Sequence, residues 1–551
     1  MDEISRKKLR LVLSSGFFSL LSAPHFLAVA EELSPQAFPT VKTITPIQHL
    51  VIIYDENVSF DHYFGTYPQA LNPPGSPRFT ARSSNITING LRVVPVPTNP
   101  DPEADPKPFR LDRSDAVTSD QAHAYGAEQK AFNEGRMNHF SRSLGNPSPQ
   151  ASGPLGSSAA VMGYYDGNTV TALWFYAQQY SMNDAAFTDT FGPSTPGALE
   201  VVAGQTNGLE RDPQNKSDIS VTLPDGQGGW TLIGDTDPIG DVCSHSALKV
   251  RMKGPHVGDL LDQQQITWGS FMGGFDLTRT NPNGSTGCQR STRSPVSGKT
   301  IRDYVPHHSW FQYYASSANP THARPVSLNT IGQGILEDGN TPEPAHHQYD
   351  LEDFFSAVET GHFPAVSYLK APASQNGHAG YSNPLDEQHF LVRIMNFLQR
   401  RKEWANTAVI ITYDDSDGWY DHAMNPTTHA SYDPQADHLN GPGRCGTTPP
   451  PLGIEGKPVN GRCGPGPRIP FLLLSPWARA NAIDHTPISQ ASIVRFIEDN
   501  WLQGKRLGRG SFDAEAGNIE NLFDFQRKSP LPPLFLDPES GLPVPSPEAT
   551  P

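Results

Sequence analysis

Two short apolar runs, each ending in a cluster of oxygen-bearing side chains, constrain this chain most. The first run, HLVIIYDEN, ends in Glu56 and Asn57, and the second, TAVIITYDDSDGWYDH, carries Asp414 and Asp415. An uninterrupted β-branched run is typical of a strand buried on both faces of a parallel sheet. Ligands of open α/β sheets bind at the carboxyl ends of such strands. The two runs therefore predict two buried strands that build one site together.

Strand and helix patterns alternate along much of the chain. Strands are expected near residues 49–54, 365–369, 408–412 and 471–474, and helices near 122–140, 169–180, 388–400 and 488–501. This alternation predicts an α/β fold with a central, mainly parallel twisted sheet flanked by helices. Residues 203–345, rich in Gly, Asn, Pro and His, are interpreted as a long loop insertion, and residues 69–118 as a surface excursion.

The first thirty residues have a different composition from the rest. Four basic residues within the first ten precede an apolar stretch that ends in Ala28-Val29-Ala30. A charged start, an apolar middle and an A-x-A site predict a signal peptide over residues 1–30, and with it a periplasmic or secreted protein. Whether export follows the Sec or the Tat route stays open.

The remainder is interpreted as one catalytic domain followed by a tail. We assign residues 31–526 to the domain, because no repeat or clean linker divides them. Residues 527–551 are rich in proline and are expected to lie extended over the surface or to be disordered.

The charge of the chain limits its partners. The formal net charge is -16, and removing the four basic and two acidic groups of residues 1–30 shifts it to about -18. Nucleic-acid binding needs a basic footprint, so no nucleic-acid partner is expected. No further long apolar run follows residue 30, so no integral membrane segment is expected in the mature chain. The oligomeric state stays open.

Four cysteines, an even number in an exported chain, indicate disulfides. Three pairings can be drawn, and Cys243–Cys288 with Cys445–Cys463 is favoured because each would close a loop rich in Gly and Pro. None of the four lies in C-x-x-C spacing, which argues against a zinc cluster.

The strand-end clusters offer three carboxylates and one amide. Oxygen ligands of this kind suit one divalent metal ion such as Mg²⁺, Ca²⁺ or Mn²⁺, with zinc and iron as alternatives. The competing interpretation is that Asp414 and Asp415 only begin a turn at residues 416–418.

A hydroxyl group near a helix start is the candidate nucleophile. In TFGPSTPGA, residues 190–198, Pro196 is predicted at the first helical position, which leaves Ser194 or Thr195 near the N-cap. A helix N-terminus favours an anion, and metal coordination would turn such a hydroxyl into a nucleophile. The alternative is plain capping.

Histidines supply the third element of a site. The chain has nineteen, and several lie in expected loops with acidic neighbours: His123, His307, His308, His346, His347, His378 and His422. Imidazoles bind phosphoryl oxygens or protonate a leaving group. His378 is favoured because it lies in a loop directly after a predicted strand.

Five motifs, in this order, resemble the bacterial phosphoesterase family of AcpA-type acid phosphatases and phosphocholine-preferring phospholipases C. They are ENVSFDHYFGTYP, GPSTPG, NGHAGYSNP, ITYDDSDGWYDH and IDHTPISQASIVRFIE, and the resemblance covers about residues 47–526. It implies a fold similar to alkaline phosphatase and arylsulfatase.

The resemblance also implies roles for single residues. It implies metal ligation by Glu56, Asn57, Asp414, Asp415 and Ser194, with Ser194 as the nucleophile, His378 and His123 as catalytic histidines that contact the phosphate, and His307 or His308 as a third, substrate-binding histidine. Val58, and Gly197-Ala198 in place of a frequent Asn-Arg pair, depart from the family pattern and bear on the substrate.

The function implied is a metal-dependent acid phosphatase that forms a phosphoserine and hydrolyses small phosphate monoesters. An acidic optimum is expected if the histidines must be protonated. The first alternative is a phospholipase C that cleaves phosphodiesters such as phosphatidylcholine at the phospholipid headgroup. Such relatives usually carry extra β-rich domains, whereas this chain ends soon after NLFDFQRK. The second is a non-catalytic secreted binding protein. No cysteine is followed by x-P-x-R, so a sulfatase is not expected.

Overall fold

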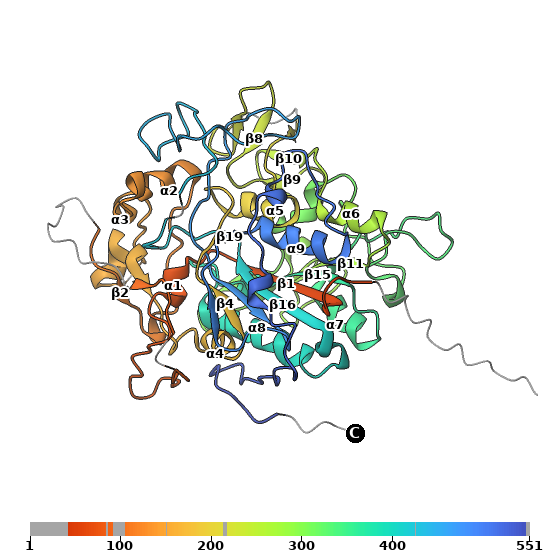
Figure 1. Cartoon of the computed structure of the whole chain (residues 1–551), viewed down its shortest axis with the longest axis horizontal. Coiled ribbons are helices and arrows are strands. Elements are labelled where there is room, and N and C mark those ends of the chain that lie inside the picture. Colours follow the sequence, from red (N-terminus) through yellow and green to blue (C-terminus); the bar gives the residue numbers. More distant parts are fainter. Residues whose placement is uncertain are drawn as a thin grey trace, which may run out of the picture. The chain divides into compact units, whose positions relative to one another are not determined.

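A large mixed sheet forms the centre of the structure (Figure 1). The computed structural model describes residues 42–83, 86–91, 105–149, 151–212, 218–424 and 426–546. The sheet has eight strands in the order β14-β11-β15-β1-β16-β17-β4-β18. The predicted signal peptide, residues 1–30, lies outside the described residues.

Seven of the eight strands run in one direction. The strands are β1 (His49–Asp55), β4 (Ser181–Asn183), β11 (Trp268–Met272), β14 (Gln348–Asp350), β15 (Val366–Lys370), β16 (Thr407–Tyr413), β17 (Phe471–Leu474) and β18 (Ala482–Asp484). Only β17 is antiparallel to its neighbours, β16 and β4. The predicted α/β class with a mainly parallel sheet is therefore confirmed.

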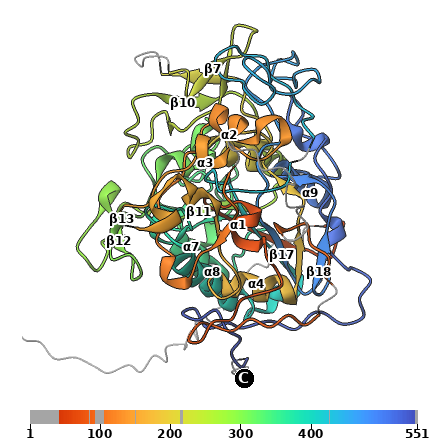
Figure 2. The same ribbon diagram turned by 90° about the vertical axis from the view of Figure 1, so that its left-hand side faces the viewer.

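Helices cover both faces of this sheet. On one face α5 (Ser194–Ala203), α6 (Val257–Gln263) and α9 (Ala491–Trp501) pack together, and α4 (Thr171–Gln179), α7 (Leu351–Glu359) and α8 (Pro384–Leu398) lie on the other (Figures 1 and 2). The other α-helices of the described residues are α1 (Phe60–Phe64), α2 (Tyr125–Phe132) and α3 (Phe140–Ser143).

The remaining strands form small two- and three-stranded sheets in the connections. They are β2 (Phe109–Arg110), β3 (Gly163–Tyr164), β5 (Ala186–Phe187), β6 (Leu209–Arg211), β7 (Thr222–Pro224), β8 (Trp230–Leu232), β9 (Asp237–Pro238), β10 (Lys249–Met252), β12 (Ser291–Arg293), β13 (Thr300–Arg302) and β19 (Ile488–Ser489).

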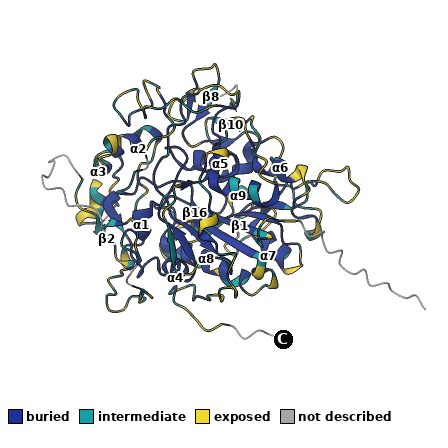
Figure 3. Cartoon of the chain, in the orientation of Figure 1, coloured by how far each residue is buried: buried dark blue, intermediate teal, exposed yellow. Residues whose placement is uncertain are grey.

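The two apolar runs of the sequence are the central strands. Residues 50–54 of β1 and the whole of β16 are buried, as the dark centre of Figure 3 shows. A strand covered by helices on both faces has no solvent side, so its sequence shows no alternation. Burial of these β-branched side chains supplies much of the apolar area that stabilises the sheet.

Two sequence interpretations are corrected by the structure. Residues 203–345 are not only a loop insertion, because they contribute β11 to the central sheet, between β14 and β15. The predicted helix over 122–140 is broken: α2 ends at Phe132, where Asn133 and Glu134 have φ values of 45° and 59°. Left-handed backbone cannot continue a helix.

Covalent and terminal features follow the sequence more closely. Both favoured disulfides, Cys243–Cys288 and Cys445–Cys463, are present. The proline-rich tail is described to residue 546 and packs against α8, where Leu536 is buried and its backbone bonds to Asn396. None of the described helices is long and apolar enough to cross a membrane.

Candidate active site

The ends of β1 and β16 bring the two acidic clusters together. These strands are adjacent and parallel, and Asp55 pairs with Tyr413 as the last register step. The next residues of both strands therefore leave the sheet at the same edge. The backbone N–H of Asn57, at φ 62°, donates to Asp414 Oδ1 over 2.9 Å.

Ser194 lies between the two clusters. Its Oγ is 3.1 Å from Glu56 Oε2, 3.2 Å from the Asn57 side-chain amide and 3.1 Å from Asp415 Oδ2. We call the side chains of these residues together with Asp414 the oxygen cluster: Glu56, Asn57, Ser194, Asp414 and Asp415. All five residues are buried, with at most 2% of their surface exposed.

The first turn of α5 presents Ser194 to this cluster. The helix begins at Ser194 itself, with Pro193 as N-cap, so Pro196 is its third residue and not its first, as the sequence had predicted. The shift is tolerated because the first four backbone N–H groups of a helix have no partner within it. Thr195 N–H is instead satisfied by Asp235 Oδ1 at 2.9 Å. Ser194, and not Thr195, faces the carboxylates of the oxygen cluster.

The oxygen cluster carries an excess of buried negative charge. Burial, and then the charge of Asp414, raise the pKa of both Glu56 and Asp415 well above its usual range. Asp414 Oδ2 accepts no hydrogen bond from any described residue. Buried charges are stable only when they are paired or coordinate a metal. The donor set, all oxygen, therefore fits a hard divalent cation.

Lys370 is a site residue that the sequence interpretation missed. It ends β15, is buried, and forms an ion pair with Glu56 Oε1. Burial lowers the pKa of Lys370, but the charges of Glu56 and Asp414 outweigh this and raise it. Three carboxylates and one ammonium leave two negative charges, which one divalent ion would balance. The signal was present, because Lys370 directly follows an apolar run as Glu56 and Asp414 do.

The two predicted catalytic histidines both border the oxygen cluster. His378 Nδ1 donates to the Ala379 carbonyl at 2.6 Å, and His123 Nδ1 donates to the Gln121 carbonyl at 2.7 Å. These bonds orient each ring, and both Nε2 atoms face the Asn57 amide, at 3.1 Å for His378 and 3.4 Å for His123. Both histidines therefore point their Nε2 atoms at the Asn57 side chain.

The surroundings of the two histidines shift their pKa values in opposite directions. Burial lowers the pKa of His378 to about 4. Burial also acts to lower the pKa of His123, but the charges of Asp415 and Asp417 outweigh it and raise the pKa well above 6.5. The site therefore disfavours a proton on His378 and favours one on His123. Asp120 and Asp417 lie beside them, and these four residues form a second group with ligand atoms within 4.8 Å of one another.

The structure separates the two neighbouring histidines His307 and His308. His308 is buried, and its Nδ1 lies 3.1 Å from Glu56 Oε1. Burial, and then the charge of His307, lower its pKa well below 6.5. His307 is partly exposed and its Nδ1 lies 3.8 Å from Asp237 Oδ1. His308 therefore contacts the oxygen cluster, whereas His307 lies nearer solvent.

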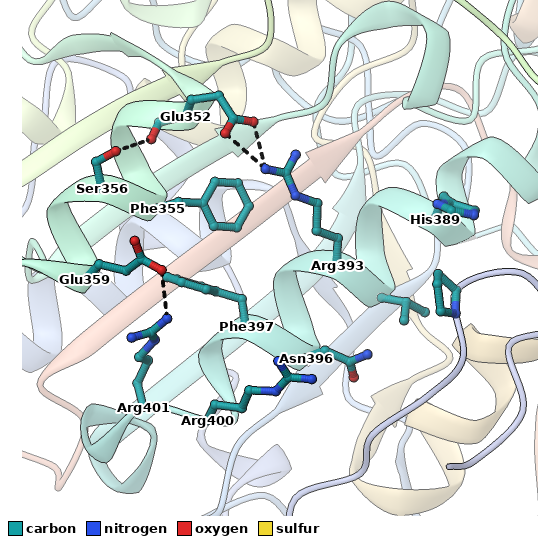
Figure 4. A pocket seen from close by; sticks show the side chains of 12 residues that line it. Glu352, Phe355, Ser356, Glu359, His389, Arg393, Asn396, Phe397, Arg400 and Arg401 are labelled. Atoms are coloured by element: carbon teal, nitrogen blue, oxygen red, sulfur yellow. Dashed lines mark hydrogen bonds and ion pairs between the residues drawn. The ribbon is translucent and has the colours of Figure 1, made fainter. Parts of the chain in front are cut away.

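Other histidines named in the sequence lie in separate clusters. His347 stacks on Trp268, and His422 pairs with Asp61 beside Arg468. A groove of about 670 Å³ between α7 and α8 likewise contains no predicted site residue (Figure 4). Two of its arginines pair with its own glutamates, Arg393 with Glu352 and Arg401 with Glu359. The candidate catalytic and metal-ligating residues lie at the edge of the sheet and not in this groove.

The chain is similar to several curated enzymes. It is 22% identical over 473 residues to "Non-hemolytic phospholipase C" of Pseudomonas aeruginosa, which covers 83% of this chain and 54% of that protein. It is 20% identical over 516 residues to "Phospholipase C B" of Mycobacterium tuberculosis, covering 92% and 83%. The chain thus spans about half the length of the Pseudomonas relative.

Similar solved structures and a family model complete the comparison. A protein of the alkaline phosphatase superfamily from Vibrio parahaemolyticus matches with a TM-score of 0.30 and 11% identity, over 89% of this chain and 77% of that one. The model of the Phosphoesterase family matches residues 47–502, which include every residue of the oxygen cluster. The chain belongs to the phosphoesterase family.

Proposed function

We propose that this protein is a metal-dependent phosphoester hydrolase that acts through Ser194. The observation that carries the proposal is the position of Ser194 Oγ, 3.1 Å from carboxylate oxygens of Glu56 and Asp415 and 3.2 Å from the Asn57 amide. A serine hydroxyl held against buried carboxylates at a helix N-terminus is suited to attack an electrophile that carries negative charge.

The oxygen cluster would hold the cation. A divalent ion bound there lowers the pKa of a coordinated hydroxyl and neutralises charge on a phosphoryl oxygen. The net charge of the three carboxylates and Lys370 supports one ion of charge two. Calcium, magnesium, manganese, zinc and iron all remain candidates.

The side chains then divide the reaction between them. Ser194 Oγ gives its proton to the Asp415 carboxylate, 3.1 Å away, and attacks phosphorus opposite the ester oxygen. A phosphoserine forms as the bond from phosphorus to the ester oxygen breaks, and the alcohol leaves. His123, which holds a proton through its acidic neighbours Asp415 and Asp417, donates that proton to the leaving oxygen. Neutral His378 lies beside the phosphoryl group. Water then gives a proton to His123 and attacks phosphorus, Ser194 Oγ leaves and recovers its proton from Asp415, and phosphate is released. Preorganised charge supplies most of the rate enhancement in such a site.

We favour a phosphomonoester as the substrate. Gly197 and Ala198 stand beside the nucleophile where the family often has Asn and Arg. A Cβ atom at Gly197 would lie 2.2 Å from the Asp414 carbonyl oxygen, so no side chain fits there. The lost polar groups support a substrate different from that of the phospholipases. The names of the curated relatives favour the second candidate, a phospholipase C acting on a phospholipid headgroup.

Comparing two p-nitrophenyl esters separates these candidates. A monoesterase turns over p-nitrophenyl phosphate faster than its phosphorylcholine ester, and a phospholipase C shows the reverse order. Turnover of neither ester by the metal-loaded protein, together with inertness toward a wider ester panel, would instead support the non-catalytic binding protein.

The direct test of the mechanism is Ser194→Ala. We expect its turnover of the preferred ester to fall by roughly 10⁴-fold or more, because the covalent step is lost. Ser181→Ala, a buried serine in β4 remote from the site, is the matched control and should stay within about twofold of the parent. Near-normal turnover by Ser194→Ala, or full activity after chelation with verified metal loss, would refute the scheme.

We also propose that the protein is exported to the periplasm or the medium. The two disulfides support an oxidising compartment. A mature N-terminus determined at residue 31 after expression in a bacterial host would support cleavage of residues 1–30. A mature protein that retains its first residues would contradict it.

A further inference from the structure

Glu128 is a buried carboxylate that joins two loops of the site without touching the oxygen cluster. It lies in α2 and has no exposed surface. Its Oε2 accepts a hydrogen bond from the Gly192 N–H at 2.8 Å, and its Oε1 accepts one from Ser416 Oγ at 3.1 Å. Both carboxylate oxygens are therefore used, one for each loop.

The partners of Glu128 adjoin the central residues of the proposed reaction. Gly192 lies two residues before Ser194 and has a φ of 123°, a conformation that favours glycine. Ser416 directly follows Asp415 and also accepts from the Gly418 N–H at 3.1 Å. The Glu128 carboxylate thus connects the loop that leads into α5 with the loop that leaves β16.

Burying this carboxylate lowers the folding stability of the protein, so its presence calls for another explanation. Within the described part of the chain, no Lys, Arg or His nitrogen lies within 4.0 Å of it. A buried carboxylate without such a partner is costly, and an apolar residue of similar volume at such a position is often neutral or stabilising. What the carboxylate contributes is its two hydrogen bonds, and both of them are accepted from loops of the site.

We infer that Glu128 is a positioning residue that holds the Gly192–Ser194 loop in register with the Asp414–Ser416 loop. The inference rests on the proposed function, because the register matters only if Ser194 is the nucleophile. Glu128 acts through Gly192 and Ser416 and has no contact with the substrate in this scheme. Misplacing a reacting atom by about 1 Å can cost on the order of 10²-fold in rate.

The first comparison uses Glu128→Ala and its neighbour Gln129→Ala. Gln129 is equally buried on α2, but its Oε1 accepts from the N–H groups of His438 and Leu439, outside the site. We expect Glu128→Ala to lower kcat by roughly 10- to 100-fold with KM and metal content unchanged. Gln129→Ala should lose comparable thermal stability and keep its kcat. Equal kcat values in these two variants would overturn the inference.

Glu128→Gln and Ser416→Ala keep the inference testable if Glu128→Ala does not fold. A glutamine can accept from the Gly192 N–H through Oε1 and donate to Ser416 Oγ through Nε2, so Glu128→Gln should retain kcat within about threefold. Ser416→Ala removes one of the two links and should lower kcat several-fold at unchanged metal content. Low kcat in Glu128→Gln, or parental kcat in Ser416→Ala, would overturn the inference.

Ser194→Ala, measured in parallel, tells the two failures apart. If Ser194→Ala keeps its turnover, the proposed function fails and the positioning role fails with it. If Ser194→Ala is inactive while Glu128→Ala matches Gln129→Ala, only the positioning role is wrong. Inactive Ser194→Ala, low kcat in Glu128→Ala and recovery in Glu128→Gln together support both.

Discussion

Single charges at the sheet edge decide what the site can bind. The sequence predicted Glu56 and Asp414 as oxygen donors at the sheet edge, because each follows a buried apolar run. Lys370 follows such a run too, and its ammonium reduces the local charge that a cation must neutralise. The sequence could not pair Lys370 with Glu56, because the contact depends on β15 and β1 being neighbours in the sheet. The sequence therefore predicted which residues supply oxygen donors, but it did not predict the net charge of the site.

His62 predicts how stability depends on pH. Its ring is buried against Trp419, with centroids 4.0 Å apart, and its Nδ1 donates to the Gly163 carbonyl at 2.7 Å. Burial lowers its pKa to about 3. Because this value lies below the unfolded value near 6.5, the stability contributed by the neutral ring is complete above pH 6.5. It is lost as the pH falls toward 3, by on the order of 4 kcal/mol.

His62→Phe should remove this part of the acid sensitivity. The variant keeps a ring to stack but loses one hydrogen bond, so at pH 7 its unfolding free energy should be about 1 kcal/mol lower than the parent's. Below about pH 5 the order should reverse. Urea unfolding of both proteins from pH 7 to pH 4 measures this, and two parallel stability curves would contradict it.

Helix α5 and the loop after β16 pack more closely than their sequences predict. Helix α5 lies against the start of the Asp414 loop, where Gly197 leaves no room for a Cβ atom. The Tyr54 hydroxyl donates to the Gly197 carbonyl at 2.8 Å, and Gln490 Nε2 donates to the Asp414 carbonyl at 2.6 Å. These contacts set the distance between Ser194 and the carboxylates.

Gly197→Ala should therefore destabilise the protein although alanine favours helices. Helix propensity alone would stabilise the variant by up to about 1 kcal/mol. A Cβ atom 2.2 Å from a backbone oxygen must instead push α5 away, so we expect a lower melting temperature and a kcat reduced about 10-fold or more. Ala198→Gly, on the same helix turn, should lose stability by propensity alone. A Gly197→Ala protein with raised stability and parental kcat would show that the close approach does not matter.

Some elements could not be predicted because their local patterns are weak or ambiguous. Strand β11 has the sequence WGSFM inside a region rich in Gly, Asn and Pro, so nothing local marks it as a central strand. The apolar run of β17 was found, but the reversed direction of that strand is a property of its connections. Helix α2 stops at Asn133, which adopts a left-handed conformation that asparagine tolerates.

The whole molecule uses its C-terminal segment as part of the fold. Residues 534–536 run along α8, where the backbone of Leu534 exchanges hydrogen bonds with Gln399 and the side chains of Phe535 and Leu536 are buried. The high proline content predicted a tail that is extended over the surface or disordered, and it did not predict this packing.

Removing residues 528–551 should cost stability without changing the chemistry. Exposing the sites of Phe535 and Leu536 should lower the free energy of unfolding by a few kcal/mol, since each buried side chain contributes about 1.5–3 kcal/mol. Thermal unfolding should show this shift, and kcat measured well below the transition should equal the parent's. Removing residues 547–551 alone is the control and should change neither value. A loss of kcat in the folded truncated protein would mean that the tail also supports the site.

The sequence by itself predicted the most apolar of the buried strands and the residues that bring oxygen donors, and it favoured one of three cysteine pairings. Burial and donor type are local properties. An uninterrupted β-branched run indicates a strand buried on both faces, and a carboxylate offers oxygen donors wherever it lies. Only the tertiary structure decided that β1 and β16 are parallel neighbours, that Ser194 reaches their carboxylates, that Lys370 pairs with Glu56, and that Glu128 bonds to Gly192 and Ser416. Such contacts join residues that are up to several hundred positions apart, and they arise from the packing of whole elements.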